Sequence, residues 1–460
     1  MPHATRSLAA KDIAYNLHPY TDLVTHEQSG PLIMTRGQGI YLWDSDDKQY
    51  IDGFAGLWCT ALGFSEKRLI EAATRQLTTL PFSHTFAHRS TIPVIELAER
   101  LISMTPEPMT KVYFVNSGSE AVDTAMKLVW YYNNALERPQ KKKIISRKRA
   151  YHGVTIAAGS LTALPFVQND FDLPIGRVLY TEAPHYYRHA EPGESEEAFS
   201  ERLAASLERL IEQEGPDTVA AFVAEPVMGA GGLIVPPRDY FEKVQDVLRR
   251  HDVLMIADEV ICGFGRTGNM WGSQTYNIRP DMITCAKQLS SAYMPIGAVM
   301  ISDVIYQALR EQSHKHGVFG TGNTYGGHPV AAAVALETLK IYEERDIVGY
   351  VRHVAPRFQQ RVKALGDHPL VGDARGVGLL GGIELVADKG SKHSFPMQAK
   401  AVARVMTAAL RHGLIVRQLP GDAVGICPPL IITEKEIDDL FDRLRRALDE
   451  AHTELASVAA

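Results

Sequence analysis

The stretch from Val253 to Lys287, VLMIADEVICGFGRTGNMWGSQTYNIRPDMITCAK, decides the fold of this chain. It contains two apolar runs, 253–257 and 281–286, each bounded by polar residues. Such runs are typical of strands that are buried on both faces of a parallel sheet. Ligands of open parallel sheets bind outside the carboxyl ends of the strands. Asp258 and Lys287 each stand at such an end, so the pattern predicts that both side chains reach one crevice.

An acid and an amine at neighbouring strand ends suggest a particular cofactor. Pyridoxal phosphate needs a lysine with which to form a Schiff base and a carboxylate that keeps its pyridine nitrogen protonated. Asp258 and Lys287 could supply these two groups. The alternative is that they form an ordinary ion pair or do not meet, so other segments must decide.

A second signal lies where an apolar strand pattern, 111–115, runs into Asn116-Ser117-Gly118-Ser119-Glu120 and a helix is expected from about Ala121. Two hydroxyls and a glycine at a helix N-terminus favour an anion, because the free N–H groups and the helix dipole point there. Simple N-capping by serine explains the same residues. The two interpretations are compatible.

Composition excludes several classes of function. A length of 460 residues predicts about two domains. The net charge of -6 is mild and argues against nucleic acid as a partner. No apolar run of 18 residues and no secretory pattern is present, so we expect a cytoplasmic protein without a membrane partner. The four cysteines lack zinc-site spacing and are too few for a disulfide scaffold, so we expect no metal.

The remaining patterns place elements along the chain. Residues 1–30 are expected to form a lead-in arm, the acidic stretch 182–201 a surface excursion, and residues 376–385 one strand of a separate, smaller unit. Strand and helix patterns alternate from about 110 to 300, which predicts a mainly parallel α/β sheet. Also expected are a hairpin of 40–44 with 50–53, strands at 143–146 and 219–224, and helices at 69–80, 92–103, 203–211, 240–250, 330–342, 350–365, 399–411 and 434–453.

Taken together, these segments are similar to the class III aminotransferases, pyridoxal phosphate enzymes of fold type I, from about Gly39 to Leu448. The resemblance implies an α/β fold with a large domain at 66–329, whose mainly parallel sheet has helices on both faces. It implies a smaller α+β domain built from both chain ends, 1–65 and 330–460. The motifs that carry the resemblance are Asn116–Glu120, Tyr151-His152-Gly153, Glu225-Pro226, Asp258–Gly268, Ala286-Lys287 and Thr324–Pro329.

The resemblance also implies roles at the cofactor. Lys287 would form the Schiff base and then carry a proton between substrate and cofactor. Asp258 would face the pyridine nitrogen, with a charge-assisted bond that contributes roughly 1.5–3 kcal/mol. Val260 and Tyr151 would contact opposite faces of the ring. The phosphate would be held by Ser117, Gly118 and Ser119, and His152 and Glu225 would complete the cofactor site.

In this family a threonine, here Thr324, completes the phosphate site of the second subunit. The resemblance therefore implies a homodimer with its active sites at the subunit interface, and possibly a tetramer. Nothing in composition or periodicity indicates this.

Within the family, Gly56–Cys59 and Ile415–Arg417 resemble the ω-transaminases that move an amino group from an amine to pyruvate. Arg417 would bind the carboxylate of the keto acid, and Trp58, Phe86 and Tyr151 would line the apolar side. Ala230 stands where ornithine- and 4-aminobutyrate-type relatives carry a glutamate, which favours the amine:pyruvate branch. Further departures from the family pattern occur at Val122, Met228 and Gln288.

The expected reaction is transfer of an amino group from a primary amine or ω-amino donor to a keto acid, pyruvate, in a ping-pong mechanism. A transaminase specific for taurine, β-alanine or a diamine is an alternative, as is another fold type I reaction such as an aminomutase or decarboxylase. A non-catalytic α/β binding protein is a third, because a fold does not fix a function.

Overall fold

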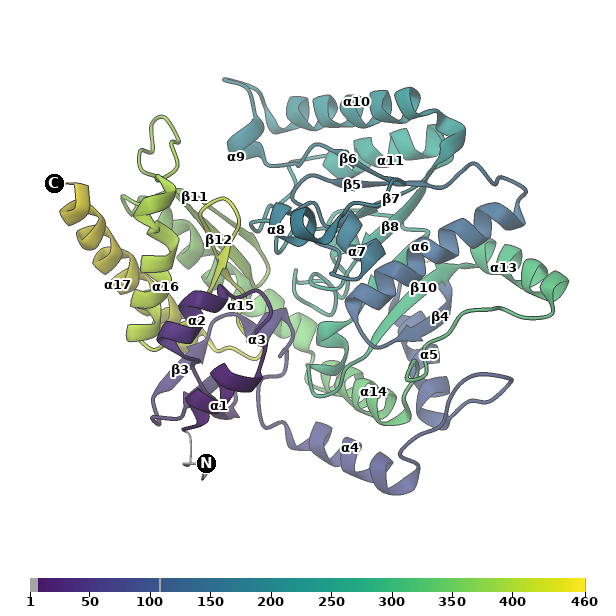
Figure 1. Cartoon of the computed structure of the whole chain (residues 1–460), viewed down its shortest axis with the longest axis horizontal. Coiled ribbons are helices and arrows are strands. Elements are labelled where there is room, and N and C mark those ends of the chain that lie inside the picture. The colour runs from purple at the N-terminus through teal and green to yellow at the C-terminus, as the bar shows by residue number, and fades with distance from the viewer. Residues whose placement is uncertain (1–6, 107–108, 460) are drawn as a thin grey trace.

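The computed structural model describes residues 7–106 and 109–459. A large sheet flanked by helices fills one side of the molecule, and elements from both ends of the chain gather on the other side (Figure 1). Within the described residues, no helix has the length and apolar character needed to cross a membrane.

The large sheet has seven strands in the order β4-β10-β9-β8-β7-β5-β6. β10 is antiparallel to both of its neighbours, and all the other pairs are parallel. The predicted mainly parallel α/β sheet is therefore confirmed. Its strands are β4 (Met109–Val115), β5 (Lys143–Arg147), β6 (Val178–Thr181), β7 (Val219–Ala224), β8 (Leu254–Asp258), β9 (Met282–Cys285) and β10 (Gly297–Ser302).

Helices cover both faces of this sheet (Figure 1). Successive residues of a strand point to opposite faces. Phe222 of β7 accordingly packs in a core with α10 and α11, whereas Val223 packs in a separate core with α6. The helices of this region are α6 (Gly118–Ala135), α7 (Ile156–Leu161), α8 (Pro165–Gln168), α9 (Tyr186–His189), α10 (Glu196–Glu214), α11 (Tyr240–Arg250), α12 (Gly272–Thr275), α13 (Asp303–His316) and α14 (Pro329–Glu344).

Two smaller sheets join the chain ends. In the order β1-β2-β3-β13, the β2–β3 hairpin is the predicted one, and β13 from the C-terminal part pairs in parallel with β3. The other sheet has the order β11-β12-β15-β14. These strands are β1 (Met34–Gln38), β2 (Tyr41–Asp44), β3 (Gln49–Asp52), β11 (Val371–Val377), β12 (Leu380–Leu385), β13 (Leu414–Ile415), β14 (Arg417–Leu419) and β15 (Ala423–Ile426).

The helices outside the large sheet lie close to their predicted ranges, with three additions before residue 60, namely α1 (Leu8–Tyr15), α2 (Leu23–Ser29) and the short α3 (Ala55–Trp58). The others are α4 (Lys67–Thr79), α5 (Ile92–Met104), α15 (Ile347–Ala364), α16 (Ala401–Arg411) and α17 (Glu434–Ala459). The lead-in arm thus contains helices α1 and α2. Ser7 caps the first and Asp22 caps the second, each with a side-chain oxygen that accepts from the first turn.

Two further expectations need correction. The stretch 376–385 is not one strand, because β11 and β12 turn at Gly378, where φ is +57°. A Cβ there would lie 2.3 Å from the backbone oxygen of Arg266, so the turn needs glycine. The stretch 182–201 is not only a surface excursion, since it contains α9 and the buried residues His185 and Phe199.

Candidate active site

Asp258 and Lys287 lie on one cavity at the carboxyl edge of the large sheet. Asp258 ends β8 and is in register with Thr284 of the adjacent strand β9, and Lys287 follows that strand by two residues. The cavity has a volume of about 390 Å³, within the range of small-molecule sites. The structure thus brings together the two groups on which the sequence argument rests.

The carboxylate of Asp258 is buried, and both of its oxygens have polar partners. Oδ2 lies 2.7 Å from Nδ1 of His152, and Oδ1 accepts from Thr284 Oγ1 at 3.1 Å and from the backbone N–H of Val260 at 3.2 Å. Three partners fix the direction in which the carboxylate points. His152 therefore acts through Asp258, and its other nitrogen, Nε2, is buried without a hydrogen bond in the described structure.

The amine of Lys287, in contrast, has no such partners in the described structure. No hydrogen bond or ion pair joins it to another described residue. Burial lowers its pKa below the ordinary lysine value, and the negative charge of Asp258 opposes this effect only in part. Since burial disfavours the charged form, Lys287 loses its proton more readily than a solvent-exposed lysine. A partly neutral amine can act as a nucleophile and as a base.

The turn before α6 forms a cradle for an anion. Ser117 caps the helix, because its Oγ accepts from Glu120 N at 3.2 Å, and Ser119 Oγ accepts from Val154 N at 3.1 Å. A Cβ on Gly118 would lie 3.0 Å from Val260 Cγ1, so glycine lets the turn approach the cavity wall. Capping and anion binding therefore coexist here, at the positive end of an 18-residue helix.

Tyr151 and Glu225 also line the cavity. Glu225 accepts from the backbone N–H groups of Tyr151 at 3.1 Å and of Gly229 at 2.9 Å, and burial raises the pKa of its carboxyl. Both carboxylate oxygens are thus engaged with backbone. Glu225 positions the Tyr151 loop, and Tyr151 presents its ring to the cavity.

The proposed substrate side is assembled only in part within this chain. Trp58 is 3 % exposed and packs at an edge-on angle against Phe54, with ring centroids 4.2 Å apart. The guanidinium of Arg417 lies 5.9 Å from the same Phe54 ring. Burial lowers the pKa of Arg417, and the nearby hydroxyls of Tyr151, which lines the cavity, and of Tyr20 act in the opposite direction.

None of the predicted residues Trp58, Arg417, Phe86 and Thr324 is among those that line the cavity, and the last two lie on the surface. Phe86 is 44 % exposed, and Thr324 is exposed. Their assigned roles stay predictions, because a contribution from a second subunit is not described by a single chain.

Some residues at the site were not predicted from the sequence. Cys59 lines the cavity, as does the segment Met294-Pro295-Ile296. Tyr20, in the N-terminal arm, donates from its hydroxyl to that of Tyr151 at 3.4 Å. The position of Cys59 beside Trp58 could have suggested it, but the arm offered no pattern that pointed to Tyr20.

The departures from the family pattern lie away from the cavity lining. Gln288 is buried, accepts from Arg266 Nη2 at 2.9 Å, and donates to two backbone carbonyls at 2.9 Å, so it ties the glycine-rich turn to the strand end. Met228 pairs with Ile234 in a small buried cluster, and Val122 lies in the core under α6.

These groups fit pyridoxal phosphate. A lysine amine without a partner, a fixed carboxylate, an aromatic ring and a helix N-terminus surround one small cavity. Lys287 would hold the cofactor's aldehyde carbon, Asp258 its ring nitrogen, and the Ser117–Ser119 turn its phosphate. The structure therefore defines the class of protein as a pyridoxal phosphate enzyme of fold type I.

Comparison with known proteins gives the family. The model of aminotransferase class-III matches residues 24–448. The chain is 51 % identical, over 94 % of its length and 84 % of the relative, to gamma aminobutyrate transaminase 1, mitochondrial, of Solanum lycopersicum. The chain belongs to the class III aminotransferases. It is an enzyme, and this family uses pyridoxal phosphate.

Two solved structures extend the comparison. The omega transaminase from Pseudomonas jessenii in complex with PMP has a TM-score of 0.97 and 52 % identity, with 98 % of this chain and 99 % of that chain covered. A transaminase with L-ala has a TM-score of 0.91 and 55 % identity, with 92 % and 100 % covered. These likenesses support the family and the fold, and they leave the amino donor open.

Proposed function

We propose that this enzyme transfers the amino group of a primary amine to pyruvate. The observation that carries the proposal is the state of Arg417. No hydrogen bond or ion pair joins its guanidinium to another described residue. A half-buried cation without an anionic partner beside a cavity is suited to a substrate carboxylate, which it can bind through two parallel hydrogen bonds.

The residues around the cavity divide the chemistry between them. When bound, the cofactor supplies an electron sink that weakens the C–H bond next to the substrate nitrogen. Lys287 Nζ would carry the proton from that carbon to the cofactor, and would return it when the keto acid is aminated. Asp258, whose carboxylate is held in place by His152 and Thr284, would keep the cofactor's ring nitrogen protonated. The anion cradle fixes the phosphate end.

The two half-reactions make different demands on the open side of the cavity. Pyruvate brings a carboxylate, which Arg417 binds. A simple amine brings an apolar group instead, which would pack against Trp58 and Tyr151. Arg417 has no tether among the described residues, so its side chain can leave the cavity for this half-reaction. The related transaminase with L-ala supports the choice of acceptor, because alanine is the amination product of pyruvate.

A second candidate is transamination of 4-aminobutyrate, and the names of the curated relatives favour it. This donor carries a carboxylate that Arg417 could also bind. Ala230 offers no carboxylate to hold Arg417 away from substrates of the other half-reaction. Both candidates therefore use the same arginine, and a direct comparison of donors must separate them.

The experiment is a donor panel with purified holoenzyme and pyruvate. Alanine formation is measured with 1-phenylethylamine and with 4-aminobutyrate, and both are repeated with 2-oxoglutarate as acceptor. The proposal predicts alanine from 1-phenylethylamine at a rate at least equal to that from 4-aminobutyrate. Alanine from 4-aminobutyrate alone would favour the second candidate. Carbon dioxide release without alanine would identify a decarboxylase and overturn both.

We also propose that the enzyme works as a homodimer. Large apolar side chains are exposed around Thr324, and such patches mark interfaces. Tyr325 is 60 % exposed and stacks edge-on with Phe82, and a Cβ on Gly322 would lie 2.6 Å from the ring of Phe86. The exposed apolar residues of this region are Leu77, Leu80, Phe82, Phe86, Ile92, Ile95 and Tyr325.

Covering this patch with a second copy would carry Thr324 and Phe86 to the partner's cavity. Sedimentation velocity tests the assembly, with a dimer expected. Ile95→Asp should shift the protein toward monomer, whereas Ile156→Asp, an exposed position on α7, should not. A monomeric and fully active wild-type enzyme would contradict the proposal.

A further inference from the structure

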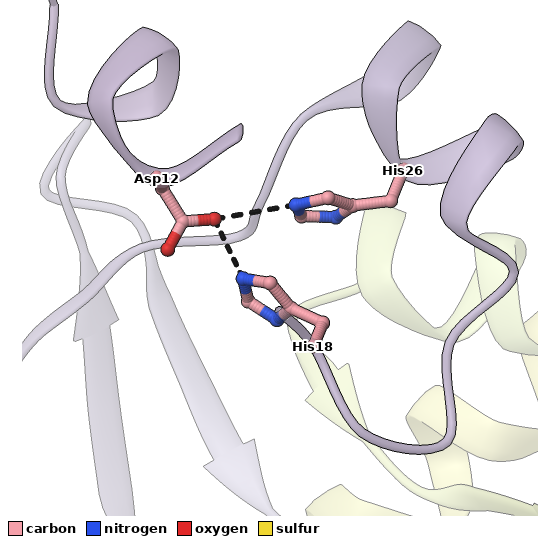
Figure 2. A group of neighbouring side chains, drawn as sticks. All are labelled: Asp12, His18 and His26. Carbon is pink, nitrogen blue, oxygen red and sulfur yellow. Dashed lines mark hydrogen bonds and ion pairs between the residues drawn. The ribbon is translucent and has the colours of Figure 1, made fainter. Parts of the chain in front are cut away.

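Three side chains of types that commonly bind metal ions lie together in the N-terminal arm, away from the cavity (Figure 2). Asp12 comes from α1, His26 from α2, and His18 from the segment between them. Asp12 Oδ2 lies 2.6 Å from His18 Nε2 and 3.3 Å from His26 Nε2. Their ligand atoms all lie within 4.8 Å of one another.

This donor set suits a divalent transition metal. Two imidazole nitrogens and a carboxylate oxygen are common zinc ligands at about 2.0–2.2 Å, and tetrahedral geometry then separates ligand atoms by roughly 3.3 Å. The Asp12–His26 distance already has this value. The Asp12–His18 contact is a hydrogen bond in the present arrangement and would have to open by well under 1 Å.

The burial of His26 is a second observation that points to a ligand at this cluster. Its side chain is only 10 % exposed, and Nε2 contacts Asp12 Oδ2 at 3.3 Å (dashed in Figure 2) without the geometry of a hydrogen bond in the described structure. Buried polar atoms are nearly always satisfied, so such an atom calls for an explanation.

A second cluster of possible metal ligands in this molecule differs from the first in its charge. The described residues contain a second group of possible ligands, Glu208, Glu212 and His251. Arg250 already donates two hydrogen bonds to Glu208, at 2.7 and 3.1 Å. A resident guanidinium neutralises that site and repels a metal ion. No Lys or Arg pairs with the carboxylate of Asp12 in the described structure.

The cluster is linked to the active site through a short segment. Tyr20 follows His18 by two residues, and its hydroxyl contacts that of Tyr151 at the cavity. Its ring also packs edge-on against Phe166, with centroids 6.0 Å apart. Fixing His18 would therefore fix the segment that carries Tyr20.

We propose that Asp12, His18 and His26 bind one divalent transition metal ion of the zinc class, which joins α1 to α2 and holds Tyr20 against the cavity. The expectation of no metal rested on the spacing of the four cysteines, and Asp12, His18 and His26 span 15 residues without a familiar pattern. The site depends on the fold of the arm. It does not depend on which amine the enzyme uses.

The test uses the holoenzyme after chelator treatment and dialysis, with Co²⁺ as the spectroscopic probe and Zn²⁺ as competitor. Wild type should bind one equivalent of Co²⁺ per chain with visible bands of a nitrogen–oxygen site, and Zn²⁺ should abolish these bands. His26→Gln and Asp12→Asn should each weaken binding by at least about tenfold, whereas His251→Gln, in the second cluster, should leave it unchanged. Cofactor absorbance and circular dichroism verify that each variant is folded.

A second measurement follows the N-terminal arm by limited proteolysis. Trypsin cleavage after Lys11, in α1, should be slowed by Zn²⁺ in wild type and in His251→Gln, but not in His26→Gln. Binding that is equal in wild type and His26→Gln, or that is lost in His251→Gln alone, would overturn the proposal. Absence of any stoichiometric Co²⁺ binding by wild type would overturn it as well.

Discussion

The two sides of the cavity are built in different ways. The inner wall comes from adjacent strand ends, and its acid, Asp258, is buried with three hydrogen-bond partners. The open side comes from segments far apart in the chain, and there Arg417 and Tyr20 have few partners. The partners of Asp258 fix its direction, whereas the side chain of Arg417 can move to suit a substrate. The inner wall therefore sets the chemistry, and the open side sets the choice of substrate.

The strongest test of this difference between the two sides of the cavity is to remove the amine of Lys287 from the inner wall. Lys287→Ala should lower kcat by at least about 10²–10⁴-fold, the usual contribution of a positioned acid–base group. The loss should be equal for every amine and keto acid, because Lys287 acts on the atoms common to all of them. Turnover assays with three donors check this. A loss confined to one donor would place Lys287 on the specificity side.

The next largest effect is expected at the acid. Asp258→Asn removes the negative charge that holds the ring nitrogen protonated, a bond of roughly 1.5–3 kcal/mol, which corresponds to about a 10- to 100-fold fall in kcat/KM. The cofactor's absorbance should change as well. Asp281→Asn is the control, since Asp281 accepts from Met255 N at the opposite end of the same strands. It should leave the absorbance unchanged.

On the open side, the effect should depend on the substrate. Arg417→Leu should lower kcat/KM for pyruvate by about 10- to 100-fold, because it removes a charge-assisted pair. The first half-reaction with 1-phenylethylamine, followed by stopped-flow absorbance, should change by less than about threefold. Arg417→Lys should recover only part of the loss, since lysine cannot form two parallel hydrogen bonds. Equal losses in both half-reactions would contradict the division between the two sides.

The smallest effect on activity is expected at Glu384, which pairs with His185 and Arg375, each at 3.0 Å, and with Arg188. Burial opposes ionisation, but these partners together hold its pKa at about 2, below the ordinary glutamate value of 4.5. A depressed carboxyl pKa stabilises the fold above pH 4.5, and this contribution, on the order of 2–4 kcal/mol, is lost as pH falls from 4.5 toward 2.

Glu384→Gln should therefore lower the melting temperature at pH 7 while kcat stays within about twofold of wild type. The difference in stability between the two proteins should shrink as the pH falls below 4.5. Glu343→Gln, on an exposed ion pair, is the control and should change stability by less than about 1 kcal/mol. A Glu384 effect that does not vary with pH would show that shape, and not charge, matters there.

The sequence could predict the inner wall because buried parallel strands leave a strong pattern. The runs before Asp258 and Lys287 are apolar on both faces, and parallel strands place their carboxyl ends at one edge. The Ser117 turn was visible for a similar reason, since a strand pattern there ends in residues that begin a helix. Each of these features depends on neighbours within a few residues.

The parts that the sequence did not predict depend on distant contacts. The turn at Gly378 is hidden in a run of glycines, and its need for glycine arises from the backbone of Arg266. The contact of Tyr20 with Tyr151 joins residues 131 apart. The meeting of Asp12, His18 and His26 requires two short helices that a polar, proline-containing arm did not reveal.

The central claim is that one cofactor is held between Lys287 and Asp258, and borohydride reduction tests it most directly. Reduced holoenzyme is digested and the peptides are mapped by mass spectrometry. The account predicts that the pyridoxyl group is found on the peptide that carries Lys287, and that no peptide of Lys287→Ala carries it. A pyridoxyl group on another lysine, or an active enzyme in which none can be fixed, would contradict the account.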